Sequence, residues 1–307
     1  MQGQLALRAY AKVNLVLDVL RRRPDGYHDV RVVMQNLDLC DDLTFTIDES
    51  WSAPNEGSTS DKDSAPNNYK ITISANRADI PTDEHNLIYK AIAKMFEMFR
   101  ISSAIHVHLE KHIPVEAGMA GGSTDCAAAI KAVNQMYELN LSLQEMMDIG
   151  VTLGADVPYC IMASTALSEG IGEVLTKVTP LSNCYVLVAK PKVRVSTAMV
   201  YKNLHLETVE KHPNVDGMIE GLADGNLDMI CSNMENILET VTTVLYPEIE
   251  QLKDIMKQNG ARNAIMSGSG PTVFGIYEEK DTATKAGELI IKEELANEVY
   301  VTVPVSE

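Results

Sequence analysis

Apolar residues in the first third of the chain recur at alternate positions, a pattern typical of β-strands. The pattern is clearest in AIHVHLE, where Ile105, Val107 and Leu109 point to one side and His106 and His108 to the other. Before it, a turn with the sequence RRRPDGY separates the first two alternating stretches. We therefore expect strands at 5–20, 31–39, 42–48, 69–74 and 104–110.

A different spacing, typical of amphipathic helices, begins at residue 86. One face of NLIYKAIAKMFEMF is apolar, with Ile88, Ile92 and Phe96 among its residues. Ser142 and Glu145 form an S-x-x-E capping box, with Gly154 as the expected stop. We expect helices at 86–99, 123–137 and 142–154, three more between 196 and 258, and one near the C-terminus. Strands are expected at 184–191, in 261–279 around a glycine-rich turn, and at the end of the chain.

The length of 307 residues suggests about two domains, and 45% hydrophobic residues supply enough material for packed cores. The pattern restarts after about residue 165, so we expect domains at 1–165 and 166–307. The stretch 49–68 is rich in Ser, Asn, Asp, Gly and Pro, which predicts a surface insertion.

Charge and cysteine content exclude several classes of function. A net charge of −17 argues against sequence-independent binding to nucleic acid. The same net charge is compatible with a locally positive pocket that binds a small anion. The five cysteines contain no C-x-x-C pair, so neither a disulfide framework nor a zinc site is expected. With no membrane-span pattern and no signal-peptide core at the N-terminus, we expect a cytoplasmic protein without a membrane partner.

The segment IPVEAGMAGGSTDCAAAI links a predicted strand to a predicted helix. Gly118, Gly121 and Gly122 leave its backbone uncovered, and Ser123 and Thr124 are suitable N-cap residues for the helix. The N–H groups at a helix N-terminus attract phosphate, so this loop is a candidate phosphate site. It matches neither the P-loop nor the dinucleotide fingerprint, and a purely structural turn is the alternative.

Two further segments carry candidate chemistry. Lys12 lies in an otherwise apolar strand with Asn14 on the same face, where the alternative is an edge-strand lysine that reaches water. Asp156 lies in LGADVPYC between apolar neighbours, where the alternative is a turn aspartate that bonds its own backbone.

Taken together, these segments resemble the GHMP kinase superfamily. The resemblance rests on AKVNLVLDV, RPDGYHDV, NLIYKA, IPVEAGMAGGSTDCAAA, GADVPYC, EGIGEVLTKV and SGSGPTVFG, which follow one another from residue 10 to about 275. It implies an α+β fold in two parts: an N-terminal ATP-binding domain like the second domain of ribosomal protein S5, and an α+β C-terminal domain. DGYH beside AKVNL is the sign of the branch whose substrate is a cytidine diphosphate-linked alcohol of isoprenoid precursor synthesis.

The resemblance also implies roles for particular residues. Lys12 and Asp156 are the expected catalytic pair, and Asn86 and Lys111 are expected near the adenosine of ATP. The residues expected to surround the ATP phosphates are Pro114, Val115, Glu116, Ala117, Gly118, Met119, Ala120, Gly121, Gly122, Ser123 and Thr124. The residues expected on the substrate side are Asn14, Tyr27, His28, Thr197 and Tyr201.

The implied reaction moves the γ-phosphoryl group of ATP to a substrate hydroxyl. Asp156 would accept the hydroxyl proton, and Lys12 would keep that carboxylate ionised and neutralise charge on the transferred group. Mg²⁺ is expected on the phosphates, held mainly by the nucleotide and water, and the sequence assigns no metal ligand. Tyr27 is expected to stack on the cytosine, and His28 to hydrogen-bond it.

The sequence also permits alternative functions and alternative interpretations of some motifs. A GHMP kinase for homoserine or mevalonate is the first alternative, and a non-catalytic nucleotide-binding module is the second. A NAD-dependent enzyme would need a fingerprint that this chain lacks. His106 and His108 are expected on a solvated sheet face rather than at a metal, and SGSGPT is either a structural hairpin or part of the site. The oligomeric state stays open.

Overall fold

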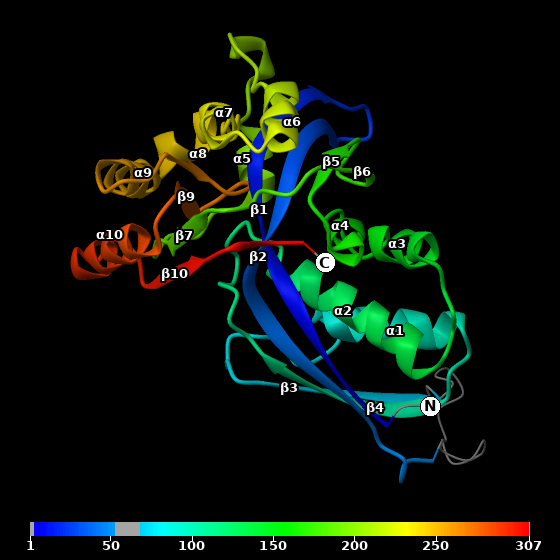
Figure 1. Ribbon diagram of the computed structural model, residues 1–307. Helices are drawn as coiled ribbons and strands as arrows, with labels where there is room; N and C mark the ends of the chain where they lie inside the picture. Colours follow the sequence, from blue (N-terminus) through cyan, green and yellow to red (C-terminus); the bar gives the residue numbers. More distant parts are fainter. Residues whose placement is uncertain (1–2, 53–67, 307) are drawn as a thin grey trace. The chain divides into compact units, whose positions relative to one another are not determined.

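The computed structural model describes residues 3–52 and 68–306, with helices and strands mixed as expected for an α+β fold (Figure 1). The predicted insertion at 49–68 lies mostly outside these residues. The described chain forms two compact units. Unit 1 comprises the described parts of Met1–Ala9, Cys40–His112 and Gly122–Met162, and unit 2 those of Tyr10–Leu39, Ile113–Gly121 and Ala163–Glu307.

Two long strands contribute residues to both units, which is why neither unit is continuous in sequence. These are β1 (Gln4–Arg22) and β2 (His28–Ile47). The segments predicted as separate strands at 31–39 and 42–48 therefore belong to one strand, β2. The division at residue 165 stays a prediction about domains, since the compact units divide the chain differently.

In unit 1, the predicted strands and helices appear in the predicted order, and α4 (Val157–Met162) is a further helix that the sequence pattern did not predict. The end of β2 pairs antiparallel with β4 (Ser103–Glu110), and β3 (Tyr69–Ala75) pairs parallel with β4. The helices of this unit are α1 (Leu87–Met98), α2 (Gly121–Met136), α3 (Leu143–Val151) and α4. The first residue of α2, Gly121, is assigned to unit 2.

Aromatic contacts join the elements of the unit 1 core. Phe96 of α1 is 1% exposed, and its ring centroid lies 5.7 Å from that of Tyr69 and 5.3 Å from that of Tyr137, both in edge-on orientation. Tyr69 begins β3 and Tyr137 follows α2, so one ring fixes α1 between a strand and a second helix. Edge-on pairs add about 0.5–1.5 kcal/mol beyond burial.

Unit 2 contains two groups of strands. Val32–Met34 of β2 pairs with β5 (Ala166–Glu169), which continues to β6 (Val174–Lys177), while β11 (Pro304–Val305) pairs with Leu37 and Asn36. A separate antiparallel sheet has the order β10-β7-β9-β8. Its strands are β7 (Tyr185–Lys190), β8 (Asn263–Met266), β9 (Val273–Tyr277) and β10 (Glu298–Thr302).

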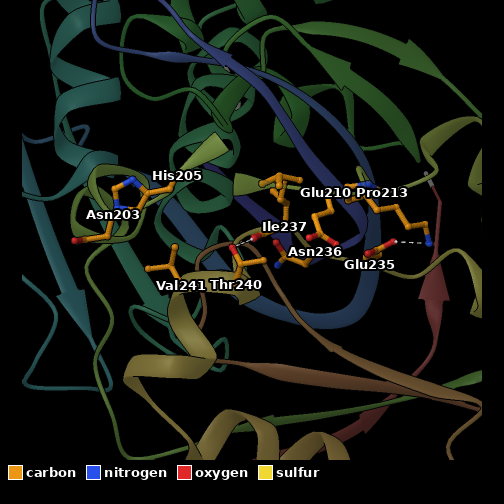
Figure 2. A pocket seen from close by; sticks show the side chains of 11 residues that line it. Asn203, His205, Glu210, Pro213, Glu235, Asn236, Ile237, Thr240 and Val241 are labelled. Atoms are coloured by element: carbon orange, nitrogen blue, oxygen red, sulfur yellow. Dashed lines mark hydrogen bonds and ion pairs between the residues drawn. The ribbon is translucent and has the colours of Figure 1, made fainter. Parts of the chain in front are cut away.

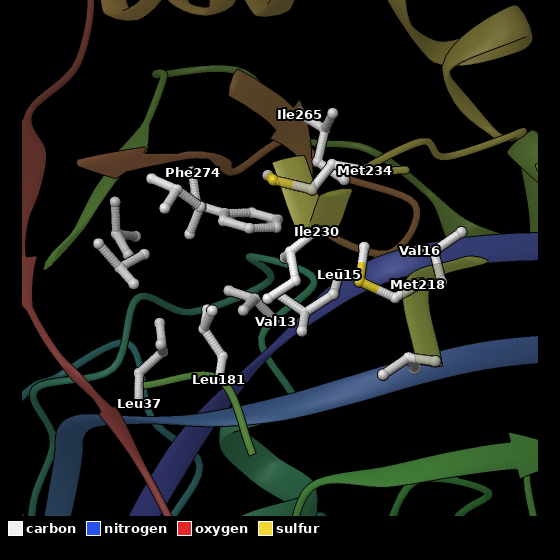
Figure 3. Packing of buried hydrophobic residues seen from close by; sticks show 14 of the residues in the cluster. Val13, Leu15, Val16, Leu37, Leu181, Met218, Ile230, Met234, Ile265 and Phe274 are labelled. Atoms are coloured by element: carbon white, nitrogen blue, oxygen red, sulfur yellow. The ribbon is translucent and has the colours of Figure 1, made fainter. Parts of the chain in front are cut away.

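Alternation along β7 separates the two faces of that sheet. Val186 and Val188 belong to the apolar cluster that also contains Val13, Leu15 and Phe274 (Figure 3). Leu187 points the other way, because a Cβ on Gly287 of α10 (Lys280–Lys292) would lie 3.1 Å from it. Each fully buried aliphatic side chain of this kind stabilises the fold by about 1.5–3 kcal/mol.

The region 196–258, all of it described, is divided more finely than the three predicted helices. It contains α5 (Thr197–Lys202), a short 3-10 helix (Leu206–Thr208), α6 (Val215–Asp224), α7 (Leu227–Ser232), α8 (Glu239–Leu245) and α9 (Glu248–Gln258). Gly225, which ends α6 in a left-handed conformation, and Pro247 before α9 mark two of the interruptions. Within the described residues, no helix is both long enough and apolar enough to cross a bilayer.

Candidate active site

Lys12 is buried in unit 2 and makes two hydrogen bonds there. Its side chain, on β1, is only 4% exposed, so it is not the water-facing edge lysine of the alternative interpretation. Nζ donates to Asn14 Oδ1 at 2.8 Å and to the carbonyl oxygen of Gly118 at 3.2 Å. Asn14 is 3% exposed, which agrees with two residues on one face of a strand. The strand therefore directs an ammonium group at the backbone of the glycine loop.

The glycine loop is held in unit 2 by its backbone and by its apolar side chains. The N–H of Lys12 donates to the carbonyl oxygen of Met119 at 3.1 Å, and Ser267 Oγ donates to the carbonyl oxygen of Gly118 at 3.0 Å. Ala117 and Met119 belong to the buried apolar cluster. Gly118 and Ala120 have φ values of 70° and 59°, so the backbone turns sharply as it reaches the helix.

The segment SGSGPT forms a hairpin, and it also lies beside the glycine loop. It connects β8 to β9, whose last pair is Met266 with Val273. A Cβ on Gly268 would lie 3.3 Å from the carbonyl oxygen of Gly118 and 3.4 Å from Asn14 Oδ1. The backbone of the hairpin thus lies against both the loop and β1.

Asn236 stabilises this hairpin, and sequence reasoning did not find it. Its Nδ2 donates to the carbonyl oxygens of Met266 and Gly268, each at 2.8 Å. It precedes α8 and also lines a cavity of about 280 Å³ in unit 2 (Figure 2). Other lining residues are Asn203, His205, Lys211, Glu235 and Thr240. Lys12, Tyr27 and His28 do not line this cavity, so it is distinct from the predicted substrate side.

Three of the predicted substrate residues make defined contacts in unit 2. The rings of His28 and Tyr201 lie 5.0 Å apart at 39°, and Thr197 Oγ1 lies 2.7 Å from Ser269 Oγ in the hairpin. Burial, and to a lesser degree the nearby Arg22 cation, lower the pKa of His28. The structure therefore brings together two predicted residues that are far apart in sequence.

Tyr27 is 59% exposed and carries its ring at the tip of the β1–β2 turn. Its backbone holds the turn, because its N–H donates to Asp25 Oδ1 at 3.1 Å and its carbonyl oxygen accepts from the Arg23 N–H at 2.7 Å. An exposed aromatic ring on a fixed backbone suits a stacking surface.

In unit 1, the start of α2 lies beside the turn that carries Asp156. A Cβ on Gly154 would lie 3.9 Å from Ser123 Oγ. Asp156 directly precedes α4, and within the described chain its half-buried carboxylate makes no hydrogen bond or ion pair. Such a carboxylate is available to a ligand. Lys12 belongs to unit 2 and Asp156 to unit 1, so their pairing stays a prediction.

The start of α2 differs from the expectation. The helix begins at Gly121, so Ser123 and Thr124 lie in its first turn rather than at its N-cap. The left-handed Ala120 ends the loop one residue earlier, and this conformation is uncommon for residues other than glycine. The amides of Gly121, Gly122 and Ser123 are then in the first turn, where N–H groups lack helical partners.

Asn86 is the N-cap of α1, as its position at the helix start suggested. Its Oδ1 accepts from the N–H of Ile88 at 2.8 Å, and its Nδ2 donates to the carbonyl oxygen of Pro81 at 2.6 Å. The expected capping box of Ser142 and Glu145 is also present at α3, although that helix ends at Val151, before Gly154.

Lys111 turns its side chain into the protein. Nζ contacts Asp41 Oδ2 at 2.5 Å and Asp125 Oδ2 at 2.6 Å, and the residue is 6% exposed. Its ammonium is thus occupied by two carboxylates, which sequence reasoning missed. Asp125 gave a signal, since a carboxylate follows Ser-Thr on the apolar side of an alanine-rich helix. No feature of the sequence around Asp41 indicated that it would contact Lys111.

His106 and His108 lie on an exposed face of the unit 1 strands. Both rings contact Ser74 Oγ, at 3.1 Å and 2.9 Å, and His108 also meets Glu110 at 2.9 Å. These contacts agree with the predicted solvated sheet face. Among the described residues, one group of metal-ligating type, Asp83, Glu84 and His85, lies exposed before α1, and we assign no function to it.

Comparison with known proteins agrees with the residues that carry the resemblance. The family model of the N-terminal domain of GHMP kinases matches residues 86–164, and that of the GHMP kinase C-terminal domain matches residues 218–295. A curated 4-diphosphocytidyl-2-C-methyl-D-erythritol kinase from Lachnoclostridium phytofermentans is 46% identical over 92% of this chain and 91% of its own. One of the same name from Lachnospira eligens is 44% identical over 97% of each chain.

Solved structures show the same fold. A crystal structure of 4-(cytidine 5'-diphospho)-2C-methyl-D-erythritol kinase aligns with a TM-score of 0.79 and 28% identity, covering 99% of this chain and 100% of the other. Homoserine kinase from Cytophaga hutchinsonii aligns with a TM-score of 0.75 at 20% identity, covering 99% and 96% of the two chains. The second likeness concerns the fold alone.

Proposed function

The chain belongs to the GHMP kinases, and on that premise we propose that it transfers the γ-phosphoryl group of ATP to the 2-hydroxyl of 4-diphosphocytidyl-2-C-methyl-D-erythritol. The protein is an ATP-dependent kinase of isoprenoid precursor biosynthesis. The observation that carries the substrate assignment is the 46% identity, over 92% of the chain, to a curated kinase of that name. The contacts of Lys12 with Asn14 and Gly118 support the catalytic part of the proposal.

The phosphates of ATP would lie along Pro114–Thr124. Backbone N–H groups in the first turn of α2 lack helical partners and carry a partial positive charge, so they suit a triphosphate. The sharp turn at Gly118 and Ala120 supports close approach of the backbone to the ligand. Asn86 and the backbone of Lys111 are proposed near the adenosine. Mg²⁺ would accompany ATP, held mainly by phosphate oxygens and water, and we assign no side chain to it.

Lys12 and Asp156 are the proposed catalytic residues. Asp156 would accept the proton of the 2-hydroxyl while Lys12 neutralises charge on the transferred group. The buried setting of Lys12 supports this role, because an ammonium in a site shielded from water acts more strongly on nearby charge. Asn14 would fix the ammonium through their 2.8 Å hydrogen bond.

The cytidine would lie against residues of unit 2. Tyr27 offers an exposed ring for stacking on the base. His28, whose lowered pKa keeps it neutral at pH 7, offers a hydrogen-bonding nitrogen beside Tyr201. Thr197, fixed by its contact with Ser269, would face the same ligand.

We also propose that the reaction takes place in the cytoplasm. All five cysteines, each within the described residues, are thiols rather than disulfides. Reduced thiols of this number suit a reducing compartment.

An assay of ADP release with ATP, Mg²⁺ and the cytidyl substrate tests the function, with homoserine and mevalonate as comparison substrates. We expect turnover with the cytidyl substrate alone. Equal turnover with either comparison substrate would contradict the substrate assignment, and absence of turnover with all three would contradict the kinase assignment.

A further inference from the structure

A buried contact between Lys111 and Asp125 joins the two ends of the glycine loop. Lys111 directly follows β4, and Asp125 lies in the second turn of α2, 14 residues later. Their charged atoms are 2.6 Å apart, and the residues are 6% and 4% exposed. The loop expected to bind the phosphates therefore begins and ends at one buried contact.

Further contacts fix the Lys111 end of the loop to the unit 1 strands. Asp41 of β2 contacts Lys111 Nζ through Oδ2 at 2.5 Å and accepts the N–H of His112 through Oδ1 at 2.7 Å. Asn76, just after β3, accepts the N–H of Lys111 at 2.9 Å and donates to its carbonyl oxygen at 3.4 Å. The start of the loop is thus held through both its backbone and its side chain.

Stability alone is a poor explanation for this cluster. Removing charged groups from water costs several kcal/mol per ion, about as much as their attraction returns. Two carboxylates share one ammonium here, and Asp125 Oδ1 has no hydrogen-bond partner among the described residues. Desolvation accordingly raises the pKa of Asp125 to about 8, although Lys111 opposes the shift. An apolar cluster would stabilise the same place at less cost, so a geometric role is the better account.

We propose that Lys111, Asp125 and Asp41 form a buried staple that closes the base of the glycine loop and sets the positions of the first amides of α2 for the ATP phosphates. They are positioning residues, because their charged groups contact one another and leave the nucleotide to the backbone. The inference rests on the proposed function, since it names what holds the proposed phosphate site. The physical reason for this role is that a loop whose two ends are not held together samples many conformations. Small displacements of the phosphate-binding groups would then lower the rate of catalysis.

Two substitutions of Asp125 distinguish a positioning role of the staple from a purely stabilising role. Asp125→Asn keeps an oxygen that accepts from Lys111, so we expect ATP affinity within about threefold of the parent. Asp125→Ala opens the staple, so we expect the dissociation constant of a non-hydrolysable ATP analogue to rise about tenfold or more. The KM for the cytidyl substrate should change less than about twofold.

The matched control is Glu298→Gln, which breaks the partly buried pair of Lys190 and Glu298 at 3.4 Å in the separate sheet of unit 2. It should alter the melting temperature while ATP affinity stays within about twofold. Asp125→Val, which leaves a smaller cavity and has no side-chain oxygen, replaces Asp125→Ala if that variant does not fold.

Calorimetric titration with the analogue keeps this test independent of turnover. Tight binding by the parent with selective loss in Asp125→Ala supports the staple even if the cytidyl substrate proves wrong. Unchanged analogue affinity in a folded Asp125→Ala or Asp125→Val variant overturns the staple. The proposal is also overturned if Asp125→Ala weakens binding of the ATP analogue and of the cytidyl substrate equally. It is likewise overturned if Asp125→Asn loses as much affinity for the ATP analogue as Asp125→Ala does.

Discussion

The ammonium of Lys12 lies 3.2 Å from the carbonyl oxygen of Gly118, a residue 106 positions later in the chain. The same carbonyl accepts a hydrogen bond from Ser267, so one backbone oxygen joins β1, the glycine loop and the glycine-rich hairpin.

Lys12→Met should reduce kcat by about 100-fold or more, because it removes the cation that we propose neutralises charge on the transferred group. Methionine keeps most of the buried volume, so the effect on folding should be smaller than the effect on turnover. Steady-state kinetics and thermal melting measure the two. Lys177→Met, at an exposed position of β6, is the control and should leave both unchanged. A Lys12→Met enzyme with more than about a third of the parent kcat would contradict the role.

Asp156→Asn should abolish most turnover while leaving ATP binding nearly intact. The carboxylate makes no hydrogen bond or ion pair among the described residues, so the amide removes the base without breaking an internal contact. Single-turnover kinetics and nucleotide titration measure the two effects. Turnover within about tenfold of the parent, equivalent to about 1.4 kcal/mol, means that Asp156 is not the base.

Tyr27→Ala should raise the KM for the cytidyl substrate by about tenfold, in the range expected for one base stacked on an aromatic ring. The ring is 59% exposed and supports little of the core, so the fold should be unaffected. The KM for ATP should change less than about twofold. Tyr27→Phe keeps the ring and should behave like the parent, whereas equal effects of Tyr27→Ala on both substrates would remove the stacking role.

Gly118→Ala should disable the enzyme through the backbone. The new Cβ would lie 2.3 Å from the carbonyl oxygen of Ser267, at a φ of 70°. Gly225 is the matched control, since its φ of 62° is similar but nothing lies within 4 Å of its Cβ position. Gly225→Ala should cost only the conformational strain, about 1–2 kcal/mol of unfolding free energy, and should retain kcat. Urea unfolding measures the free energy of unfolding of both variants, and steady-state kinetics measures their kcat. If Gly118→Ala and Gly225→Ala lost similar amounts of both, backbone strain alone would explain the effect of Gly118→Ala.

The free energy of unfolding should fall as pH rises from about 5 to 8, because of Asp125. Burial raises the pKa of this carboxyl to about 8. In the unfolded chain an aspartate releases its proton near pH 4, so between these values the folded state holds a proton that unfolding releases. The contribution is full below about pH 4 and is lost as pH rises through the folded value, by at most about 1.4 kcal/mol per pH unit.

Asp125→Asn removes that titration, so the stability difference between this variant and the parent should change steadily between pH 5 and 8. The charged groups around Asp125 are Lys111 and Asp41, and the pKa of the adjacent Cys126 is raised to about 12, outside this window. Urea titrations at three pH values measure the difference. A constant difference would show that Asp125 does not titrate there.

Local features of this protein could be predicted because neighbouring residues determine them. The capping box of Ser142 and Glu145 and the N-cap at Asn86 depend on hydrogen bonds that span two or three positions. Strand alternation at 104–110 likewise predicts which side chains are buried, since successive residues face opposite sides. The motifs and their order were enough to indicate the family.

Tertiary structure decided which distant groups meet. Lys111 was expected near the adenosine, and only the folded chain shows its ammonium between Asp41 and Asp125. SGSGPT was expected to be either a hairpin or part of the site, and only the folded chain shows that its Ser267 hydrogen-bonds Gly118, 149 residues away. The physical reason is that burial and pairing of polar groups depend on contacts between segments far apart along the chain, whereas sequence periodicity reports only which face of its own element a side chain occupies.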